Sequence, residues 1–213
     1  MKTAILFDLD GTLLDTLGDL HAATNAVLRS FGYPERTLDE VRRFVGNGAR
    51  VLIQQAVPEG ETHRVDEVLA AFQVYYAAHC DILTRPYPGI PELLVQLGEH
   101  YPLAVVSNKP DRAVKELAAI YFPSLYARGE STDCPRKPAP DMVRMAMEAL
   151  QADRCVYVGD SEVDVLTAKN AGVPCVAVTW GFRDVQTLRD AGAEYFCHTA
   201  ADLPQLIEKI LET

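Results

Sequence analysis

The chain has 213 residues, of which 48% are hydrophobic and 23% charged, a balance typical of a folded globular protein. Its 20 basic and 30 acidic residues give a net charge of −10, which argues against nucleic acid or an anionic membrane as a partner, because both attract basic surfaces. At about 150 residues per domain, the length lies between one domain and two.

Short apolar runs alternate with stretches of helical period along most of the chain. They predict strands at 3–7, 103–106, 155–158 and 175–178, with weaker ones at 125–127 and 195–197. Helices are predicted at 90–99, 111–121, 141–150, 161–171, 184–191 and 202–211. The strands are apolar at successive positions, as in parallel strands that are covered on both faces. This order indicates an α/β fold with a doubly wound parallel sheet.

The segment from Asp15 to Leu83 breaks the alternation, since it has helical pattern and no convincing strand. One apolar stripe ends at Gly32, and Thr37 with Glu40 fits a capping box that begins a further helix. We therefore expect an all-helical cap, residues 15–83, inserted after the first strand. The remaining residues, 1–14 and 84–213, would form the α/β core.

Polar residues follow several of the predicted strands, at the edge where parallel sheets bind ligands. Asp8 and Asp10 follow the first strand, Ser107 and Asn108 the second, and Asp160 a third. Each of these observations taken alone also fits a surface turn or a helix cap. Their occurrence at three strand ends together indicates a single site.

The two-residue spacing of Asp8 and Asp10 predicts side chains that point the same way. Two such carboxylates need a cation between them or a shared proton, and oxygen ligands without sulfur or histidine favour Mg²⁺. Asp160 would supply a third carboxylate. We expect Asp164, one helical turn further on, to orient a partner rather than to bind the metal, although a solvated helix face explains it equally well.

Four ordered motifs carry a resemblance to a known family. They are DLDGT at 8–12, SN at 107–108, Lys137 followed by a proline, and GDSEVD at 159–164. In these motifs the chain resembles the haloacid dehalogenase superfamily of aspartate-dependent phosphohydrolases, and the resemblance covers nearly the whole chain. It implies a Rossmann-like core with an inserted cap and a phosphatase activity.

The resemblance also implies roles for individual residues. Asp8 would be the nucleophile that forms an aspartyl phosphate, and Asp10 the general acid and base. Ser107, Asn108 and Lys137 would bind the transferring phosphoryl group. The Mg²⁺ ligands would be Asp8, Asp10 through its backbone carbonyl, and Asp160. These roles suit phosphoryl transfer, which requires a metal, an ammonium group and neutral donors around the developing charge.

A stretch with three arginines and no acid, residues 42–50, lies within the expected cap. It resembles the cap loop of phosphoglycolate phosphatases, and its glycine amides with a nearby arginine suit a small carboxylate. An ordinary helix surface is an equally good interpretation. The resemblance favours 2-phosphoglycolate as substrate, with pyrophosphate, sugar phosphates and nucleotides as alternatives. A mutase is disfavoured, because no lysine occurs between Lys2 and Lys109.

Five widely spaced cysteines without a CxxC pair favour neither a disulfide framework nor a zinc site, and they predict a cytoplasmic location. No run reaches the roughly 18 apolar residues that a membrane helix needs. We expect a monomer or a weak homodimer that acts on a small phosphorylated metabolite. A remote alternative is a non-catalytic protein that binds a phosphorylated ligand, but such a protein would be expected to have lost Asp8 or Asp10.

Overall fold

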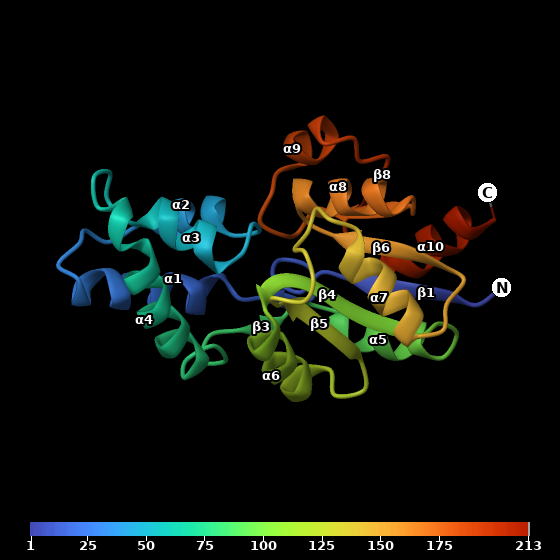
Figure 1. The fold of residues 1–213 in the computed structure, drawn as a ribbon. Helices are drawn as coiled ribbons and strands as arrows, with labels where there is room; N and C mark the ends of the chain where they lie inside the picture. Colours follow the sequence, from blue (N-terminus) through green and yellow to red (C-terminus); the bar gives the residue numbers. More distant parts are fainter. Residues whose placement is uncertain (213) are drawn as a thin grey trace.

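A computed structural model describes residues 1–212. Its main sheet has six strands in the order β5-β4-β1-β6-β7-β8, and every neighbouring pair is parallel (Figure 1). The strands are β1 (Thr3–Phe7), β4 (Leu103–Pro110), β5 (Tyr126–Glu130), β6 (Arg154–Gly159), β7 (Cys175–Val178) and β8 (Tyr195–Cys197). The predicted α/β fold with a doubly wound parallel sheet is therefore confirmed.

Helices cover both faces of this sheet. They are α5 (Ile90–Gly98), α6 (Asp111–Tyr121), α7 (Asp141–Ala149), α8 (Glu162–Ala171), α9 (Val185–Asp190) and α10 (Leu203–Leu211), with a 3-10 turn at Ala200–Asp202. Residues Ile5 and Phe7 of β1 pack in the cluster that contains the apolar faces of α5, α6 and α10, whereas Ala4 and Leu6 pack with α7 and α8. The strand is buried at all five positions, which is why its sequence is apolar without alternation.

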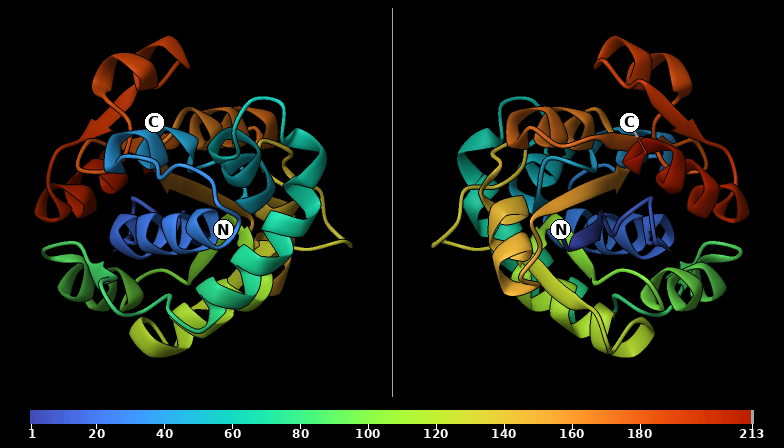
Figure 2. Two further views of the ribbon diagram at one scale, coloured as in Figure 1. Left: turned by 90° about the vertical axis from the view of Figure 1, so that its left-hand side faces the viewer. Right: turned by 90° about the vertical axis from the view of Figure 1, so that its right-hand side faces the viewer.

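A second group of helices lies apart from the sheet in Figure 1, on the left of the view. This four-helix group consists of α1 (Leu17–Ser30), α2 (Leu38–Phe44), α3 (Ala49–Ala56) and α4 (Val65–Ala77), with a 3-10 turn at Thr62–Arg64. Figure 2 views the molecule from this side, where α4 crosses in front of the sheet. The predicted capping box is present, because Thr37 and Glu40 exchange side-chain and backbone hydrogen bonds at the start of α2.

Two very short strands join the four-helix group to the sheet, and the sequence pattern did not predict them. β2 (Leu14–Asp15) pairs antiparallel with β3 (Arg85–Pro86), so that Asp15 lies opposite Arg85. Beside this pair, the buried Asp19 carboxylate accepts hydrogen bonds from the Leu83 and Thr84 amides at 2.9 Å. Two-residue strands are too short to produce an alternating apolar pattern in the sequence.

No helix within residues 1–212 combines the length and apolar character needed to cross a membrane.

Candidate active site

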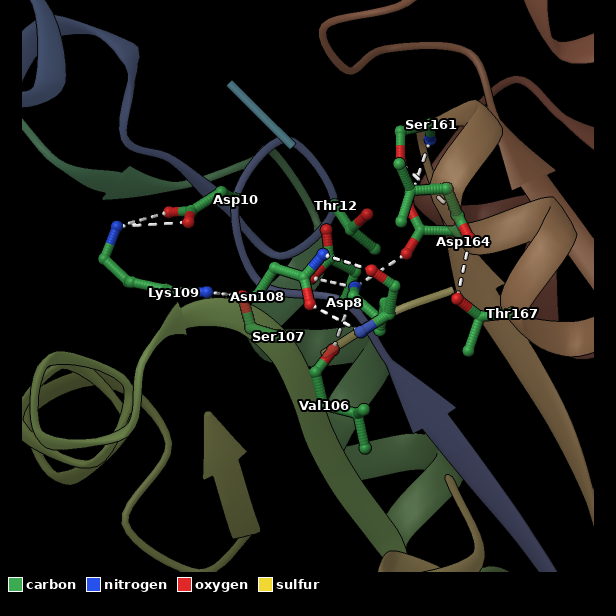
Figure 3. Close-up of polar contacts among 12 residues, drawn as sticks. Asp8, Asp10, Thr12, Val106, Ser107, Asn108, Lys109, Ser161, Asp164 and Thr167 are labelled. Atoms are coloured by element: carbon green, nitrogen blue, oxygen red, sulfur yellow. Dashed lines mark hydrogen bonds and ion pairs between the residues drawn. The ribbon is translucent and has the colours of Figure 1, made fainter. Parts of the chain in front are cut away.

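The predicted site residues meet at the carboxyl ends of three adjacent strands. β1 lies between β4 and β6, so Ser107 in β4, Asp8 after β1 and Asp160 after β6 occupy neighbouring positions on one edge. Figure 3 shows the side chains from these strand ends gathered around Asp8. All three residues are buried. Their proximity follows from the strand order, since parallel strands end at the same edge of the sheet.

Lys137 lies at the centre of this arrangement, although it comes from a loop. Its Nζ donates hydrogen bonds to Asp8 Oδ1 and Asp164 Oδ1, both at 2.8 Å, and it contacts the Tyr157 hydroxyl at 3.0 Å and the Val106 carbonyl at 3.2 Å. The lysine side chain is 2% exposed. The neighbouring Arg136 donates instead to the Asn47 carbonyl at 2.9 Å, so Lys137 is the basic residue of this loop that lies beside Asp8.

Burial and charge shift the pKa values of this cluster. Burial raises the pKa of Asp8 to about 7, against the opposing charge of Lys137. Burial, with the neighbouring charge of Asp164, also raises the pKa of Asp160 well above its usual range. Burial alone would lower the pKa of Lys137, but Asp164 and Asp8 hold it well above its ordinary value. The ammonium group of Lys137 therefore does not fully neutralise the buried carboxylates around it.

Three carboxylates, those of Asp8, Asp160 and Asp164, have oxygens within 4.8 Å of one another, and one ammonium group compensates them. Their donor set consists entirely of oxygen, which suits a hard divalent cation such as Mg²⁺. The excess of negative charge in a buried site gives a second reason why a cation fits here. The group is therefore a candidate metal site.

Hydrogen bonding distinguishes the three carboxylates. Asp164 receives hydrogen bonds at both oxygens, from Lys137 and Tyr157 at Oδ1 and from the Ser161 amide and hydroxyl at Oδ2. A carboxylate has about four lone-pair sites, and these contacts occupy most of them, although the Tyr157 hydroxyl has one proton and lies as close to the Val106 carbonyl; Asp164 is therefore less open to an ion than Asp8 or Asp160. Asp8 has one such partner, Lys137, and Asp160 has two. Asp164 thus orients Lys137, as its position in the sequence suggested, and it is fully buried rather than on a solvated face.

Two glycines enclose the Asp160 carboxylate. A Cβ atom on Gly11 would lie 2.3 Å from Asp160 Oδ2, and a Cβ on Gly181 would lie 2.3 Å from Asp160 Cβ. Thr12 Oγ1 and the Phe182 amide donate hydrogen bonds to the two carboxylate oxygens, at 3.1 and 2.7 Å. The close glycines and the two hydrogen bonds therefore hold the Asp160 carboxylate in one orientation.

Asp10 differs from the expectation that its side chain would share a cation with Asp8. Its carboxylate accepts hydrogen bonds from Lys109 Nζ at 2.8 and 3.1 Å and from Thr16 Oγ1 at 2.6 Å. Figure 3 shows this pair to one side of the Asp8 cluster. The spacing of two residues did not predict the orientation of the Asp10 side chain, because strand β1 ends at Phe7 and side chains alternate regularly only within a strand.

The Ser107 and Asn108 side chains have different environments. Ser107 lines the cavity next to Asp8, and its Oγ accepts a hydrogen bond from the Lys109 amide at 3.2 Å. The Asn108 side chain accepts from the Lys137 amide at 2.7 Å and donates to the Lys137 and Gly46 carbonyls. Both N–H groups of this amide are therefore engaged, and Asn108 holds the backbone of Lys137 in place.

The three arginines of residues 42–50 do not face the cavity, which agrees with an ordinary helix surface rather than with a carboxylate site. Arg42 forms an ion pair with Asp39, Arg50 forms one with Asp66, and Arg43 is exposed. Gly46 and Gly48 from the same stretch do line the cavity, as the sequence suggested. The basic residues that line it are instead Lys109 and Arg183, and no motif in the sequence predicted either of them.

Arg183 connects the loop after β7 to the four-helix group. It donates hydrogen bonds to the Arg42 carbonyl at 3.0 Å and the Val45 carbonyl at 2.6 Å, at the end of α2, and its Nε pairs with Glu162 at 2.8 Å. These carbonyls are left without partners by the end of the helix. No pattern in the sequence around 183 indicated this contact, which depends on how the two parts of the chain meet.

The cavity has a volume of about 50 Å³ and lies between the strand ends and the four-helix group. Its floor includes Asp8, Asp10, Ser107 and Asp160, and its cover is mostly apolar. The residues of the cover come from α1, the loop around Gly46, α3 and α4; they include Leu20, Val45, Ala49, Phe72 and Tyr76.

Comparison with known proteins agrees with this geometry. A family model for haloacid dehalogenase-like hydrolases matches residues 5–178. A phosphoglycolate phosphatase of Rhodobacter capsulatus is 38% identical, and the match covers 98% of both chains. Phosphoglycolate phosphatase 1 of Pseudomonas aeruginosa is also 38% identical, over 84% of this chain and 70% of its own length.

Solved structures share the fold over the same extent. A crystal structure from Lactobacillus delbrueckii, provisionally assigned as a phosphoglycolate phosphatase, has 39% identity and a TM-score of 0.90, and the match covers 97% of this chain and 99% of that one. A protein of Clostridium acetobutylicum, provisionally assigned as a phosphatase, has 29% identity and a TM-score of 0.81 over both full chains. The family model over residues 5–178 and the relatives of 38% identity over most of the chain together show that the chain belongs to the haloacid dehalogenase-like hydrolase family.

Proposed function

We propose that this hydrolase is a Mg²⁺-dependent phosphatase that converts 2-phosphoglycolate to glycolate and phosphate. The observation that carries the proposal is the buried Asp8 carboxylate, 2.8 Å from Lys137 Nζ, beside Ser107 on the floor of the cavity. The full-length similarity to proteins named phosphoglycolate phosphatase supports the choice of substrate.

In the proposed reaction, an Asp8 carboxylate oxygen attacks phosphorus and displaces the alkoxide of glycolate. Asp10 protonates that alkoxide as the P–O bond breaks, and in the second step it removes a proton from the water that attacks the aspartyl phosphate. Phosphate leaves and the Asp8 carboxylate is restored. Lys137 places a positive charge next to the phosphoryl group throughout, while Ser107 offers a neutral donor.

Mg²⁺ would be held by the carboxylates of Asp8 and Asp160 and the backbone carbonyl of Asp10. When bound, it would offset the charge of the phosphoryl oxygens. Asn108 and Asp164 would act through Lys137, because their hydrogen bonds fix its backbone and its ammonium group. This refines the role expected for Asn108 from direct binding of the phosphoryl group to positioning.

The size of the cavity favours a small leaving group over the larger alternatives. A volume of about 50 Å³ is room for a few water-sized groups, since one water needs roughly 10–15 Å³, so even 2-phosphoglycolate would need the four-helix group to move outward. A nucleotide base or a sugar ring would need a larger movement. Pyrophosphate is small enough, but the largely apolar cover, with Leu20 and Phe72, suits a carbon chain better.

We further propose that residues 15–83 act as a cap that opens and closes over residues 1–14 and 84–213. The contact of Arg183 with α2, and that of Asn108 with Gly46, would be made on closure. We also propose a cytoplasmic location, consistent with five cysteines that are all free thiols, and a monomer or weak homodimer.

Steady-state kinetics on 2-phosphoglycolate, pyrophosphate, a sugar phosphate and a nucleotide tests the substrate. We expect the highest kcat/KM with 2-phosphoglycolate, and a higher value with pyrophosphate would reject the assignment. Asp8→Asn tests the mechanism, because it keeps the shape of the side chain and removes the nucleophile. Mg²⁺-dependent turnover of p-nitrophenyl phosphate that persists in this variant would rule out an aspartyl phosphate.

A further inference from the structure

Lys109 is the basic side chain on the cavity wall whose only side-chain anion within residues 1–212 is another residue of the cavity, Asp10. Among the described residues that line the cavity, two carry a positive charge, Lys109 and Arg183. The Arg183 guanidinium is already engaged by Glu162 and by backbone carbonyls of the four-helix group. Lys109 is 3% exposed, so its charge is directed into the site rather than into solvent.

The present partner of Lys109 is the side chain proposed as the general acid. Lys109 Nζ donates to both Asp10 oxygens, at 2.8 and 3.1 Å, and Thr16 Oγ1 donates to Asp10 at 2.6 Å. In this arrangement the Asp10 carboxylate is turned towards Lys109 and away from Asp8 (Figure 3). To protonate a leaving oxygen next to Asp8, Asp10 has to give up at least part of the contact with Lys109.

Tyr76 of α4 completes this corner of the cavity. Lys109 Nζ lies 4.6 Å from the centre of the Tyr76 ring, a favourable contact of a cation with an aromatic face. The Tyr76 side chain is 4% exposed, and its hydroxyl makes no hydrogen bond of good geometry with the described residues, although the Lys109 ammonium group lies close enough to interact with it. A buried hydroxyl without a partner is costly, and it indicates a position where a ligand would supply one.

We infer that Lys109 and the Tyr76 hydroxyl together bind the carboxylate of the substrate, and that this binding releases Asp10 for catalysis. The carboxylate replaces Asp10 as the anion beside Lys109, and the released Asp10 carries, as a neutral carboxyl group, the proton that it gives to the leaving oxygen, so that no charge is left unpaired. Asp10 keeps its hydrogen bond with Thr16 and turns towards the leaving oxygen. The inference rests on the proposed function and specifies the substrate class as phosphate esters of short 2-hydroxy acids.

The spacing along β4 fits a short acid. Ser107 and Lys109 are two residues apart on the same strand and both line the cavity, although the register of β4 with β5 shifts between Val106 and Pro110. A carboxylate on the carbon next to the ester oxygen reaches Lys109 while the phosphoryl group lies at Ser107 and Asp8. An ester without a carboxylate leaves the Lys109 pair with Asp10 intact, and is therefore turned over more slowly.

The experiment compares 2-phosphoglycolate with 2-hydroxyethyl phosphate, which has a similar size but an alcohol in place of the carboxylate. The quantity measured is the ratio of the two kcat/KM values, with kcat and KM resolved for each substrate. The parent protein is compared with Lys109→Gln and Tyr76→Phe. Lys115→Gln is the matched control, because it removes the same charge from an exposed position on α6.

The parent protein should favour 2-phosphoglycolate, and Lys109→Gln should lower that preference by about 10- to 100-fold, the value of a hydrogen bond to a charged group. Tyr76→Phe should lower it by about 3- to 10-fold. The loss should fall mainly on KM for 2-phosphoglycolate, because Lys109→Gln lacks the ammonium group that binds the carboxylate, while kcat for 2-hydroxyethyl phosphate should not fall, because Asp10 is no longer held by Lys109. Lys115→Gln should leave the ratio unchanged.

Two other outcomes separate this inference from the proposed function. An equal loss on both substrates in Lys109→Gln would reduce Lys109 to a positioning residue for Asp10 and overturn the inference, while the phosphatase function stands. A parent protein without preference for 2-phosphoglycolate would reject the proposed substrate and the inference with it. Tyr76→Phe retains the ring and hence the packing, so an unchanged ratio in this variant overturns the shared binding even if Lys109→Gln does not fold.

Discussion

Lys137→Met should destabilise the metal-free protein by about 3–5 kcal/mol at neutral to alkaline pH, the usual result of removing one partner of a buried ion pair. Methionine fills much of the same volume, so the loss comes from charge rather than from a cavity. The substitution removes the single ammonium group that lies 2.8 Å from both Asp8 and Asp164, whose side chains are 10% and 0% exposed.

The loss should depend on pH in a way that packing does not explain. Without the lysine, the carboxylate cluster takes up an additional proton at a higher pH than in the parent protein, since burial already raises the pKa of Asp8 to about 7. In the pH range in which the folded variant holds one proton more than the folded parent protein, the destabilisation should shrink by about 1.4 kcal/mol for each unit that the pH falls. The loss is therefore largest in alkaline solution.

The free energy of unfolding of the parent protein and of Lys137→Met is measured by urea unfolding followed by circular dichroism, at about pH 5 and about pH 8 with EDTA present. It is obtained by linear extrapolation to zero urea, since stability falls linearly with denaturant. Lys169→Met is the control, an exposed lysine on α8 that should change stability by less than about 1 kcal/mol. A Lys137→Met loss below about 1 kcal/mol in alkaline solution, or one equal at both pH values, would refute the reasoning.

Three further predictions follow from the same site. Gly181→Ala should weaken Mg²⁺ binding at least about tenfold in a calorimetric titration, because the new Cβ would lie 2.3 Å from Asp160 Cβ; Gly98→Ala, with 3.8 Å to its nearest neighbour, should have no effect. Metal-free protein should lose thermal stability as the pH rises from about 4 to about 7, because the raised pKa of Asp8 makes the folded state bind more protons than the unfolded one in that range. Added Mg²⁺ should remove this loss, and a stability that rises steadily through the range would contradict the assignment. Arg183→Gln should raise KM about 5- to 50-fold with a smaller change in kcat, since it removes two hydrogen bonds to the end of α2, and an unchanged KM would show that this contact does not support closure.

Much of the sheet could be predicted because its strands are buried on both faces. The runs at 3–7, 175–178 and 195–197 coincide with β1, β7 and β8, and the helix predicted at 111–121 coincides with α6. The pairing of β2 with β3 could not be predicted, because each strand has two residues and the partners are 70 positions apart in the chain. Pairing of this kind depends on the tertiary structure.

The strand-end motifs predicted the location of the site but not all its contacts. Asp8, Ser107 and Asp160 were predicted together, since strand order alone brings them to one edge. The partner of Asp10 was missed, because it depends on the turn after β1 rather than on spacing. Lys109 was within reach of prediction, as it lies two residues after Ser107 in the same strand.

The pairing of β2 with β3 has a consequence for how substrate choice can change. Residues paired in antiparallel strands have Cα atoms about 4.5–5.5 Å apart, so the chain enters the four-helix group after Asp15 and returns at Arg85 through almost the same point. A segment whose ends lie so close together is exchangeable, as in domain insertion, because its replacement does not pull on the scaffold. If residues 15–83 form the proposed cap, a different helical segment joined at this point would meet the same Asp8, Lys137 and Asp160 with a different cover.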